Sequence, residues 1–261
     1  MRRISVSRLM VAAMLLGGVF LFSGCEIFSS PQNTFAPTGQ VADDQKNLFL
    51  ITMWPALVIM IAVEFGLLYI LWRFRRKKGD PGLPAQTHGN NKLEIAWTVA
   101  PMILMAFFIA PTIGGIFDLG RTPKNSLEVD VTGQRFSWSF SYPDPRGGPP
   151  VASSPGEKPE MHIPLGKTIA IKLKAIDVNH SFWVPKLAGK TDAIPGRANH
   201  MWLKGDEIGT YEGQCAEFCG TGHAVMRFAV VVESQEDFDA WLKGQAAAQR
   251  TDQPALAFQG D

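Results

Sequence analysis

The residues most able to do chemistry lie in one short stretch near the C-terminal end of the chain. Cys215, Cys219, His223 and Met226 fall within twelve positions, separated by gaps of four, four and three residues. Thiolate, imidazole and thioether groups are ligands that select copper, zinc or iron–sulfur clusters over magnesium or calcium. A further strong donor, His180, occurs 35 residues earlier, beside a proline-bounded loop. The joint occurrence of these residue types predicts a metal site.

The residues alone leave several metals and one covalent alternative open. Two cysteines and two histidines can hold tetrahedral zinc, and Cys215 and Cys219 could instead form a disulfide in an oxidising compartment. A disulfide would leave His180, His223 and Met226 without a role. A blue-copper site uses two histidines, one cysteine and a weak axial methionine. Because that set is present here with one additional cysteine, we favour copper over zinc.

The donors must be positioned by a β-domain, which we place at residues 121–243. Its sequence has short alternating or β-branched segments separated by turn-rich segments, a pattern typical of a sandwich or barrel. The clearest such segments are residues 127–131, 136–142, 168–175 and 228–233. The length suffices for a small all-β Greek-key sandwich, in which loops distant in sequence meet at one end. Such a loop cluster would bring His180 next to the later donors.

The end of the chain is predicted to contain one helix and a disordered tail. Residues 236–242 have a helical pattern, with Ser234 as the N-cap and acidic residues in the first turn. Residues 244–261 are polar and rich in alanine and glutamine. We expect this tail to lack ordered structure.

Two apolar segments precede the β-domain and predict a transmembrane hairpin within residues 48–120. Residues 49–72 and 97–117 are each long enough to cross a bilayer, which requires about 20 residues. The loop between them begins with a basic cluster: Arg73, Arg75, Arg76, Lys77 and Lys78. The positive-inside rule places this loop in the cytoplasm. The β-domain would then lie on the outer side of the membrane.

The first 24 residues read as a secretory signal. Arg2, Arg3 and Arg8 precede an apolar run that ends at the small residues before Cys25. This pattern favours a lipoprotein signal, with Cys25 as the lipidated first residue of the mature chain; an ordinary cleaved signal is the alternative. Residues 25–47 would form a periplasmic segment. Both mature termini would then lie on the periplasmic side of a bacterial plasma membrane.

Charge gives fewer functional indications. The formal net charge is +1, so no global charge argument points to nucleic acid. Glu64 lies inside the first apolar segment, where an ionisable group is expensive and faces either a protein partner or water. It could contact another subunit or snorkel within a helix bundle. Glu94 precedes the second apolar segment, where an acid also stabilises a helix N-terminus.

In its metal-binding stretch and its membrane segments, the sequence resembles subunit II of the cytochrome c oxidases, a family of haem–copper oxygen reductases. QCAEFCGTGHAVM, ending at Met226, resembles the family's binuclear copper motif at every ligand position. DVNHSFWVPKLAGKTDAIPGRAN (177–199) resembles its other signature, which contains the upstream histidine. KLEIAWTVAPMIL (92–104) is similar to the start of its second membrane helix. The resemblance covers roughly residues 45–243 and implies a cupredoxin-like sandwich.

The resemblance implies a role for each donor. Cys215 and Cys219 would bridge two coppers, with His180 and His223 each capping one copper. Met226 would complete one coordination sphere and the backbone carbonyl of Glu217 the other. The carboxylate of Glu217 would reach a magnesium site at the border with the catalytic subunit. The six donor residues are His180, Cys215, Glu217, Cys219, His223 and Met226.

The resemblance also implies partners and an activity. The chain would accept electrons from cytochrome c or a similar carrier and pass them to haem in catalytic subunit I, which works with other oxidase subunits. Oxygen reduction there would be coupled to proton pumping, with no catalytic residue for oxygen in this chain. Glu94 falls where the family has an acid at the mouth of a proton channel. Neither apolar segment contains a histidine, so haem must be held by a partner.

One position departs from the family pattern. The family has two tryptophans in a Q-W-x-W stretch, and the first is its electron-accepting residue. Here Phe136 occupies the first position and Trp138 the second. The donor could therefore differ from a standard soluble cytochrome c.

Several other functions fit part of the sequence. A copper-containing nitric oxide reductase subunit would look similar, and a membrane-tethered copper-binding or assembly protein would need no electron-transfer role. A quinol-oxidase subunit shares the architecture but lacks the copper ligands. A zinc-stabilised domain is the remaining alternative.

Overall fold

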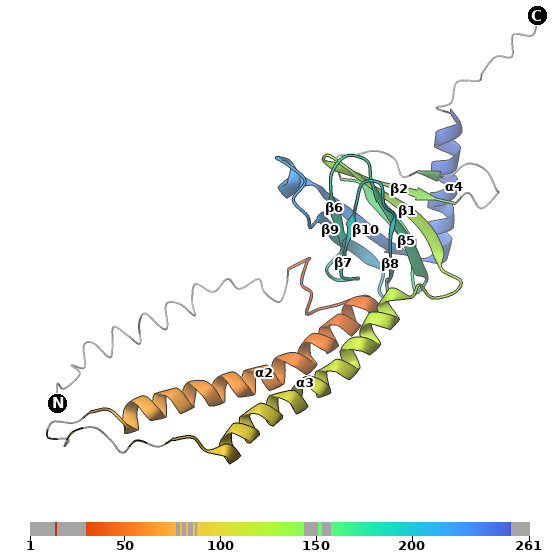
Figure 1. The fold of residues 1–261 in the computed structure, drawn as a ribbon. Coiled ribbons are helices and arrows are strands. Elements are labelled where there is room, and N and C mark those ends of the chain that lie inside the picture. The colour runs from red at the N-terminus through yellow and green to blue at the C-terminus, as the bar shows by residue number, and fades with distance from the viewer. Residues whose placement is uncertain are drawn as a thin grey trace, which may run out of the picture.

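The protein consists of a long helical hairpin joined to a β-sandwich (Figure 1). The computed structural model describes residues 30–76, 88–143 and 158–251, together with positions 14, 79, 82, 86, 151 and 152. The signal peptide expected at 1–24 (apart from position 14), the lipidation site Cys25, Lys77 and Lys78 of the basic cluster, and residues 252–261 of the tail lie outside the described residues.

The hairpin is formed by α2 (Gln40–Arg73) and α3 (Asn91–Gly120). Both helices are long and apolar enough to cross a membrane, with mean hydropathies of 2.2 and 2.0. The 30 residues of α3 span about 45 Å at 1.5 Å per residue, more than the ~30 Å hydrocarbon core of a bilayer. The helices therefore extend beyond both apolar segments predicted from the sequence.

The N-terminus of α3 is closed by a reciprocal cap. The Asn90 side chain accepts hydrogen bonds from the backbone N–H groups of Lys92 and Leu93, at 3.1 and 3.3 Å. The backbone N–H of Asn90 donates to Oε1 of Glu94 at 3.2 Å. Because the first N–H groups of a helix have no partner within the helix, this arrangement stabilises its start. Glu94 thus has the helix-terminus role that the sequence suggests, and its proton-channel role stays a prediction.

The sandwich contains two five-stranded sheets, ordered β3-β2-β1-β5-β8 and β4-β10-β9-β6-β7. The strands are β1 Leu127–Gln134, β2 Ser137–Tyr142, β3 Val151–Ala152, β4 Glu160–Pro164, β5 Thr168–Ala175, β6 His180–Trp183, β7 Lys190–Ala193, β8 Asn199–Lys204, β9 Gly209–Cys215 and β10 Arg227–Glu233. The pairs β1–β5 and β4–β10 are parallel, and the other named pairs are antiparallel. The predicted cupredoxin-like sandwich behind a two-helix hairpin is confirmed.

The core between the sheets follows the alternation in the strands. In β5 the inward positions Ile169, Ile171 and Leu173 are buried, while the residues between them are more exposed. Near the end that carries the metal-binding loop, Phe182 and Phe228 stack with ring centroids 4.5 Å apart. Burial of such large apolar side chains stabilises the sandwich and fixes the strands that hold the donors.

The C-terminal helix α4 (Gln235–Thr251) corrects one prediction. Ser234 caps it as expected, because the backbone N–H of Asp237 donates to Ser234 Oγ at 3.1 Å. The helix continues well past residue 244, where we expected a disordered tail. The reason is packing: Phe238, Leu242 and Ala246, spaced four residues apart, are all buried against the sandwich.

The start of α2 and the end of α3 are hydrogen-bonded to the sandwich. The backbone N–H of Ala42, at the start of α2, donates to the carbonyl of Leu187 at 3.2 Å. Trp202 Nε1 donates to the carbonyl of Leu119 near the end of α3, at 3.1 Å. Gly39 lies at this junction, where an added Cβ would approach the carbonyl oxygen of Lys204 to 2.5 Å. A side chain there would force the helix and sandwich apart.

Candidate metal centre

Two adjacent strands and one loop bring the predicted donors together. His180 begins β6 and Cys215 ends β9, and these strands pair with Phe182 opposite Cys215. After Cys215 the chain turns through a loop containing a short 3₁₀ helix, His223–Val225, before β10 begins. The backbone N–H of Cys215 donates to the carbonyl of Met226 at 3.0 Å, which closes this loop. The loop fixes all the later donors beside His180.

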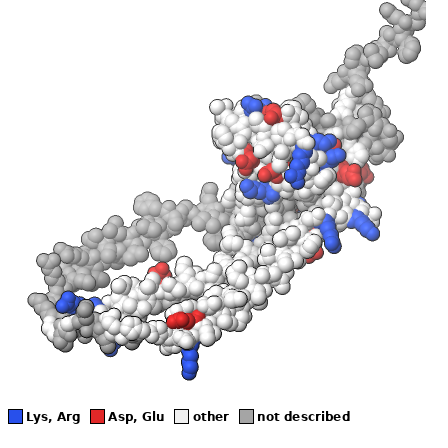
Figure 2. Space-filling view, viewed as in Figure 1, with Lys and Arg blue, Asp and Glu red and all other residues white. Residues whose placement is uncertain are grey.

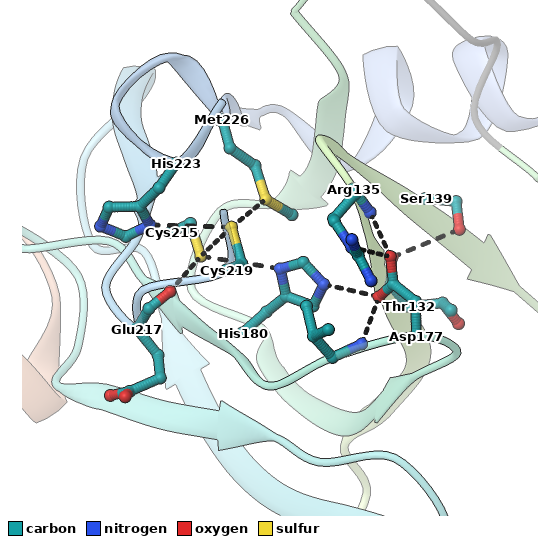
Figure 3. A network of polar contacts seen from close by, with 11 residues as sticks. Thr132, Arg135, Ser139, Asp177, His180, Cys215, Glu217, Cys219, His223 and Met226 are labelled. Atoms are coloured by element: carbon teal, nitrogen blue, oxygen red, sulfur yellow. Dashed lines mark hydrogen bonds and ion pairs between the residues drawn. The ribbon is translucent and has the colours of Figure 1, made fainter. Parts of the chain in front are cut away.

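The six donors converge on the two cysteine sulfurs (Figure 3). The Sγ atoms of Cys215 and Cys219 lie 3.9 Å apart. His180 Nδ1 lies 3.8 Å from Cys215 Sγ, and His223 Nδ1 lies 3.7 Å from Cys219 Sγ. Each sulfur therefore has one imidazole nitrogen next to it.

A weaker donor accompanies each sulfur. The carbonyl oxygen of Glu217 lies 3.3 Å from Cys215 Sγ, and Met226 Sδ lies 3.7 Å from Cys219 Sγ. The arrangement is thus two matched sets, each with thiol, imidazole and one further donor. A single tetrahedral zinc would use four of these six donors and leave the last pair without function. Donors of this kind suit a soft metal such as copper.

The thiols are unbonded and buried. Both cysteines are free, and their relative exposures are 4% and 5%. Their Sγ–Sγ distance of 3.9 Å is far longer than the ~2.05 Å of a disulfide. It is shorter than twice the metal–thiolate distance of about 2.3 Å, so one metal can bind both sulfurs. The disulfide alternative therefore does not describe this structure.

Burial keeps the Cys219 thiol protonated in the absence of metal. Burial, with the neighbouring Cys215 as a second cause, raises the pKa of Cys219 to about 11. Metal binding requires the thiolate, so it must release this proton.

Asp177 orients His180 and is the functional residue that sequence reasoning missed. His180 is fully buried, and its Nε2 donates to Asp177 Oδ1 at 2.9 Å. This hydrogen bond places the ring proton on Nε2 and leaves Nδ1 free as a ligand on the side of Cys215. The sequence contained a usable signal, since a metal-binding histidine commonly donates its other ring N–H to a carboxylate and Asp177 lies three residues from His180.

Asp177 is itself fixed by further hydrogen bonds. The backbone N–H groups of Arg135 and Val178 donate to its carboxylate at 2.8 and 2.7 Å. Arg135 Nε also lies 3.4 Å from Oδ2. Burial raises the pKa of this carboxyl, but the hydrogen bonds from His180, Arg135 and Val178 outweigh burial and hold the pKa well below its usual range.

The other candidate residues occupy distinct places. The Glu217 side chain is exposed and points away from the sulfurs (Figure 3), so only its carbonyl joins the donors. Trp138 is only 3% exposed, and its ring lies edge-on to His180, with centroids 5.9 Å apart. Phe136 is 38% exposed and lies over the loop glycines, where a Cβ on Gly222 would approach its ring to 2.5 Å. Glu94 is at the start of α3, away from this centre, in the helix cap.

The fold and the donor set together define a class: a membrane-attached β-sandwich protein with a buried thiol–imidazole–thioether site. Comparison with known sequences agrees with both halves of this description. Residues 157–235 match the family "Cytochrome C oxidase subunit II, periplasmic domain", and residues 32–113 match the corresponding transmembrane domain family.

Individual relatives give the same result. The chain is 40% identical over 230 residues to cytochrome c oxidase subunit 2 of Alkalihalophilus pseudofirmus, covering 86% of this chain and 64% of that protein. It is 33% identical over 258 residues to cytochrome c oxidase subunit 2 of Bacillus subtilis, covering 92% and 69%. It is 31% identical over 236 residues to quinol oxidase subunit 2 of Bacillus spizizenii, covering 88% and 70%. The chain thus spans about two thirds of the length of these relatives.

A solved structure is also similar in part. The periplasmic domain of subunit II of cytochrome oxidase from Bradyrhizobium japonicum is 34% identical and covers 49% of this chain and 99% of that chain, with a TM-score of 0.45. The two family matches and the relatives in Bacillus show that the chain belongs to the cytochrome c oxidase subunit II family, and its relatives are subunits of haem–copper oxidoreductases.

Proposed function

We propose that this chain is the electron-input subunit of a respiratory terminal oxidase. It accepts electrons from cytochrome c or a similar carrier at a binuclear copper centre. It passes them to haem in a catalytic subunit, where oxygen reduction is coupled to proton pumping. The observation that carries the proposal is the convergence of two matched donor sets on two sulfurs 3.9 Å apart.

The residues of the chain would hold two copper ions, which supply one-electron redox chemistry when bound. Cys215 and Cys219 would bind both ions, and His180 and His223 one each. Burial of the sulfurs and of Met226 excludes water from the centre. Asp177 holds the His180 ring in one orientation, so the ligands need not move when the oxidation state changes.

Water-exposed apolar side chains surround the centre and would meet the electron donor. Phe218 and Val225, in the metal-binding loop, are 77% and 76% exposed, and Ile176 beside His180's loop is 66% exposed. Phe136 lies against the same loop. Asp177, three residues before His180, is engaged with Arg135. This surface suits a carrier whose redox edge has an apolar surround rather than a ring of lysines.

The orientation in the membrane follows from charge. Arg73 ends α2, and Arg75 and Arg76 follow it directly, so the loop between the helices would be cytoplasmic. The copper domain would then face the periplasm. We also propose a lipid anchor at Cys25 after signal cleavage, a proton-channel role for Glu94, and magnesium binding by the exposed carboxylate of Glu217.

The proposal is tested on the assembled oxidase with Cys219→Ser. Stopped-flow mixing with reduced cytochrome c should show electron transfer to haem in the parent complex and none in the variant. A small artificial reductant should still reduce the haem of the variant, as a control for an intact catalytic subunit. Unchanged electron transfer from cytochrome c in the variant would favour a copper-holding or assembly role for this chain. If the assembled complex reduces nitric oxide and not oxygen, the chain belongs to the related nitric oxide reductase function.

A further inference from the structure

The turn between β1 and β2 lies at the end of the sandwich that carries the metal-binding loop. It consists of Arg135 and Phe136, which follow the last residue pair of the β1–β2 ladder. β1 and β2 belong to one sheet, whereas β6, β9 and β10, which carry or flank the six donors, belong to the other. The turn supplies none of the donors, yet it contacts the residues that hold both imidazoles.

His180 is held by the β1–β2 hairpin through three contacts. The backbone N–H of Arg135 donates to Asp177 Oδ2 at 2.8 Å, and Asp177 Oδ1 accepts from His180 Nε2 at 2.9 Å. The His180 ring also packs on Gly133 of β1, where an added Cβ would lie 3.1 Å from the ring. Trp138 of β2 meets the same ring edge-on. This imidazole is therefore fixed by the opposite sheet.

Phe136 contacts the part of the metal-binding loop just before His223. Its ring lies against Gly220 and Gly222, where added Cβ atoms would come within 3.2 and 2.5 Å of ring carbons. The backbone N–H of His223 donates to the carbonyl of Gly220 at 3.1 Å, and Gly222 precedes the 3₁₀ helix that starts at His223. Gly220 has a φ of 131°, a conformation that favours glycine. The ring thus covers loop backbone that has no side chains of its own to fix it.

We propose that the Arg135–Phe136 turn is a clamp that positions both imidazoles of the copper centre without binding copper. Arg135 acts through Asp177 on His180. Phe136 acts through the two loop glycines on His223. Glycines lose more conformational freedom on ordering than other residues, and packing of an aromatic ring on them offsets part of that cost. The inference rests on the proposed copper centre, but the order of the loop can be measured without metal, so the two can fail separately.

Hydrogen exchange in the metal-free, full-length chain tests the contact between the ring and the loop. The parent is compared in detergent with Phe136→Ala and with the matched control Leu165→Ala. Leu165 is outside the metal-binding loop and has a similar exposure, 42% against 38% for Phe136. Exchange of the backbone N–H groups in residues 216–226 should be about tenfold faster in Phe136→Ala and unchanged in Leu165→Ala. Equal exchange in the parent and Phe136→Ala would overturn the proposal.

Copper release gives a second readout that a general loss of stability would not reproduce. A chelator should remove copper about tenfold faster from Phe136→Ala than from the parent. The EPR hyperfine couplings of the two copper nuclei should become unequal, because only the His223 half is loosened. Phe136→Trp, which keeps an aromatic ring, should restore both properties.

Charge does not account for such a difference. The variants have the charge of the parent, and Figure 2 shows acidic and basic side chains interspersed on the visible face of the sandwich. A parent chain that takes up no copper would overturn the copper centre, whereas release from Phe136→Ala at the parent rate would overturn the clamp alone.

A double substitution isolates the contact itself. Gly222→Ala adds a Cβ 2.5 Å from Phe136 Cγ, while the φ of −89° at this position is one that alanine adopts in turns. The substitution should therefore speed copper release from the parent. In a chain that already carries Phe136→Ala it should have little further effect, because the ring that it would displace is gone. Fully additive effects of the two substitutions would contradict a direct contact between the ring and the loop, and with it the clamp.

Discussion

Asp177 offers the most informative perturbation, because it affects the centre through one ligand without being a ligand. Replacing it by alanine removes the acceptor for His180 Nε2, whose hydrogen bond is 2.9 Å long. It also removes the acceptor for the backbone N–H groups of Arg135 and Val178. Without these bonds the His180 ring can rotate and change the nitrogen that carries its proton.

The structure sets the expected magnitude. Loss of an outer-sphere partner typically lowers metal affinity 10- to 100-fold, or about 1.4–2.7 kcal/mol. The Asp177 side chain is 25% exposed, so water can replace part of the lost hydrogen bonding. We therefore expect the free energy of unfolding of the metal-free protein to fall by only about 1–2 kcal/mol. Copper affinity should suffer more than folding.

The assay is competition for copper against a chelator of known affinity, with thermal unfolding of the metal-free protein measured in parallel. Asp177→Asn is the control, because its amide oxygen can still accept from His180 while its NH₂ faces the N–H of Arg135. Its affinity should lie between those of the parent and Asp177→Ala. Unchanged copper affinity in Asp177→Ala would refute the assignment of Asp177 as the residue that orients His180.

Three further predictions follow from packing, ligation and surface charge. Gly213→Ala places a Cβ 2.2 Å from the ring of Phe228 and should lower the free energy of unfolding by about 1–3 kcal/mol in thermal melts. Gly244→Ala, which meets no atom within 4 Å, is the control and should not destabilise the protein. Equal melting temperatures of the two variants would contradict the packing argument. Met226→Leu should retain copper and stability but change the visible spectrum and the reduction potential, since it removes the Sδ atom 3.7 Å from Cys219 Sγ; an identical spectrum would argue against ligation by Met226. Phe218→Ala should slow reduction of the copper centre by a c-type cytochrome about tenfold, with an unchanged copper spectrum. The rate of reduction of the parent protein should depend only weakly on salt concentration, and a steep dependence would contradict an apolar docking surface.

The sequence was sufficient to predict which residues cluster around the two cysteines and which strands have clear alternation. The segment predicted at 168–175 coincides with β5, and its alternation is the burial pattern of that strand. The donors could be predicted because a metal site needs particular residue types at close spacing. Their convergence depends on the pairing of β6 with β9, which only the general behaviour of sandwich loops suggested.

Other features depend on tertiary structure that local patterns do not encode. Asp177 acts through a loop whose conformation is set partly by Arg135, 42 positions away in the chain. The continuation of α4 to Thr251 depends on Ala246, a small residue whose burial against the sandwich gives little hydrophobic signal in the sequence.

The most direct test of the proposed function is a copper count and an EPR spectrum of the full-length chain, purified in detergent and loaded with copper. The account predicts two copper ions per chain and a hyperfine pattern in which one unpaired electron couples equally to two copper nuclei. A colourless protein with one zinc ion, or a single copper with a localised spectrum, would contradict the binuclear centre and with it the proposed electron-input role.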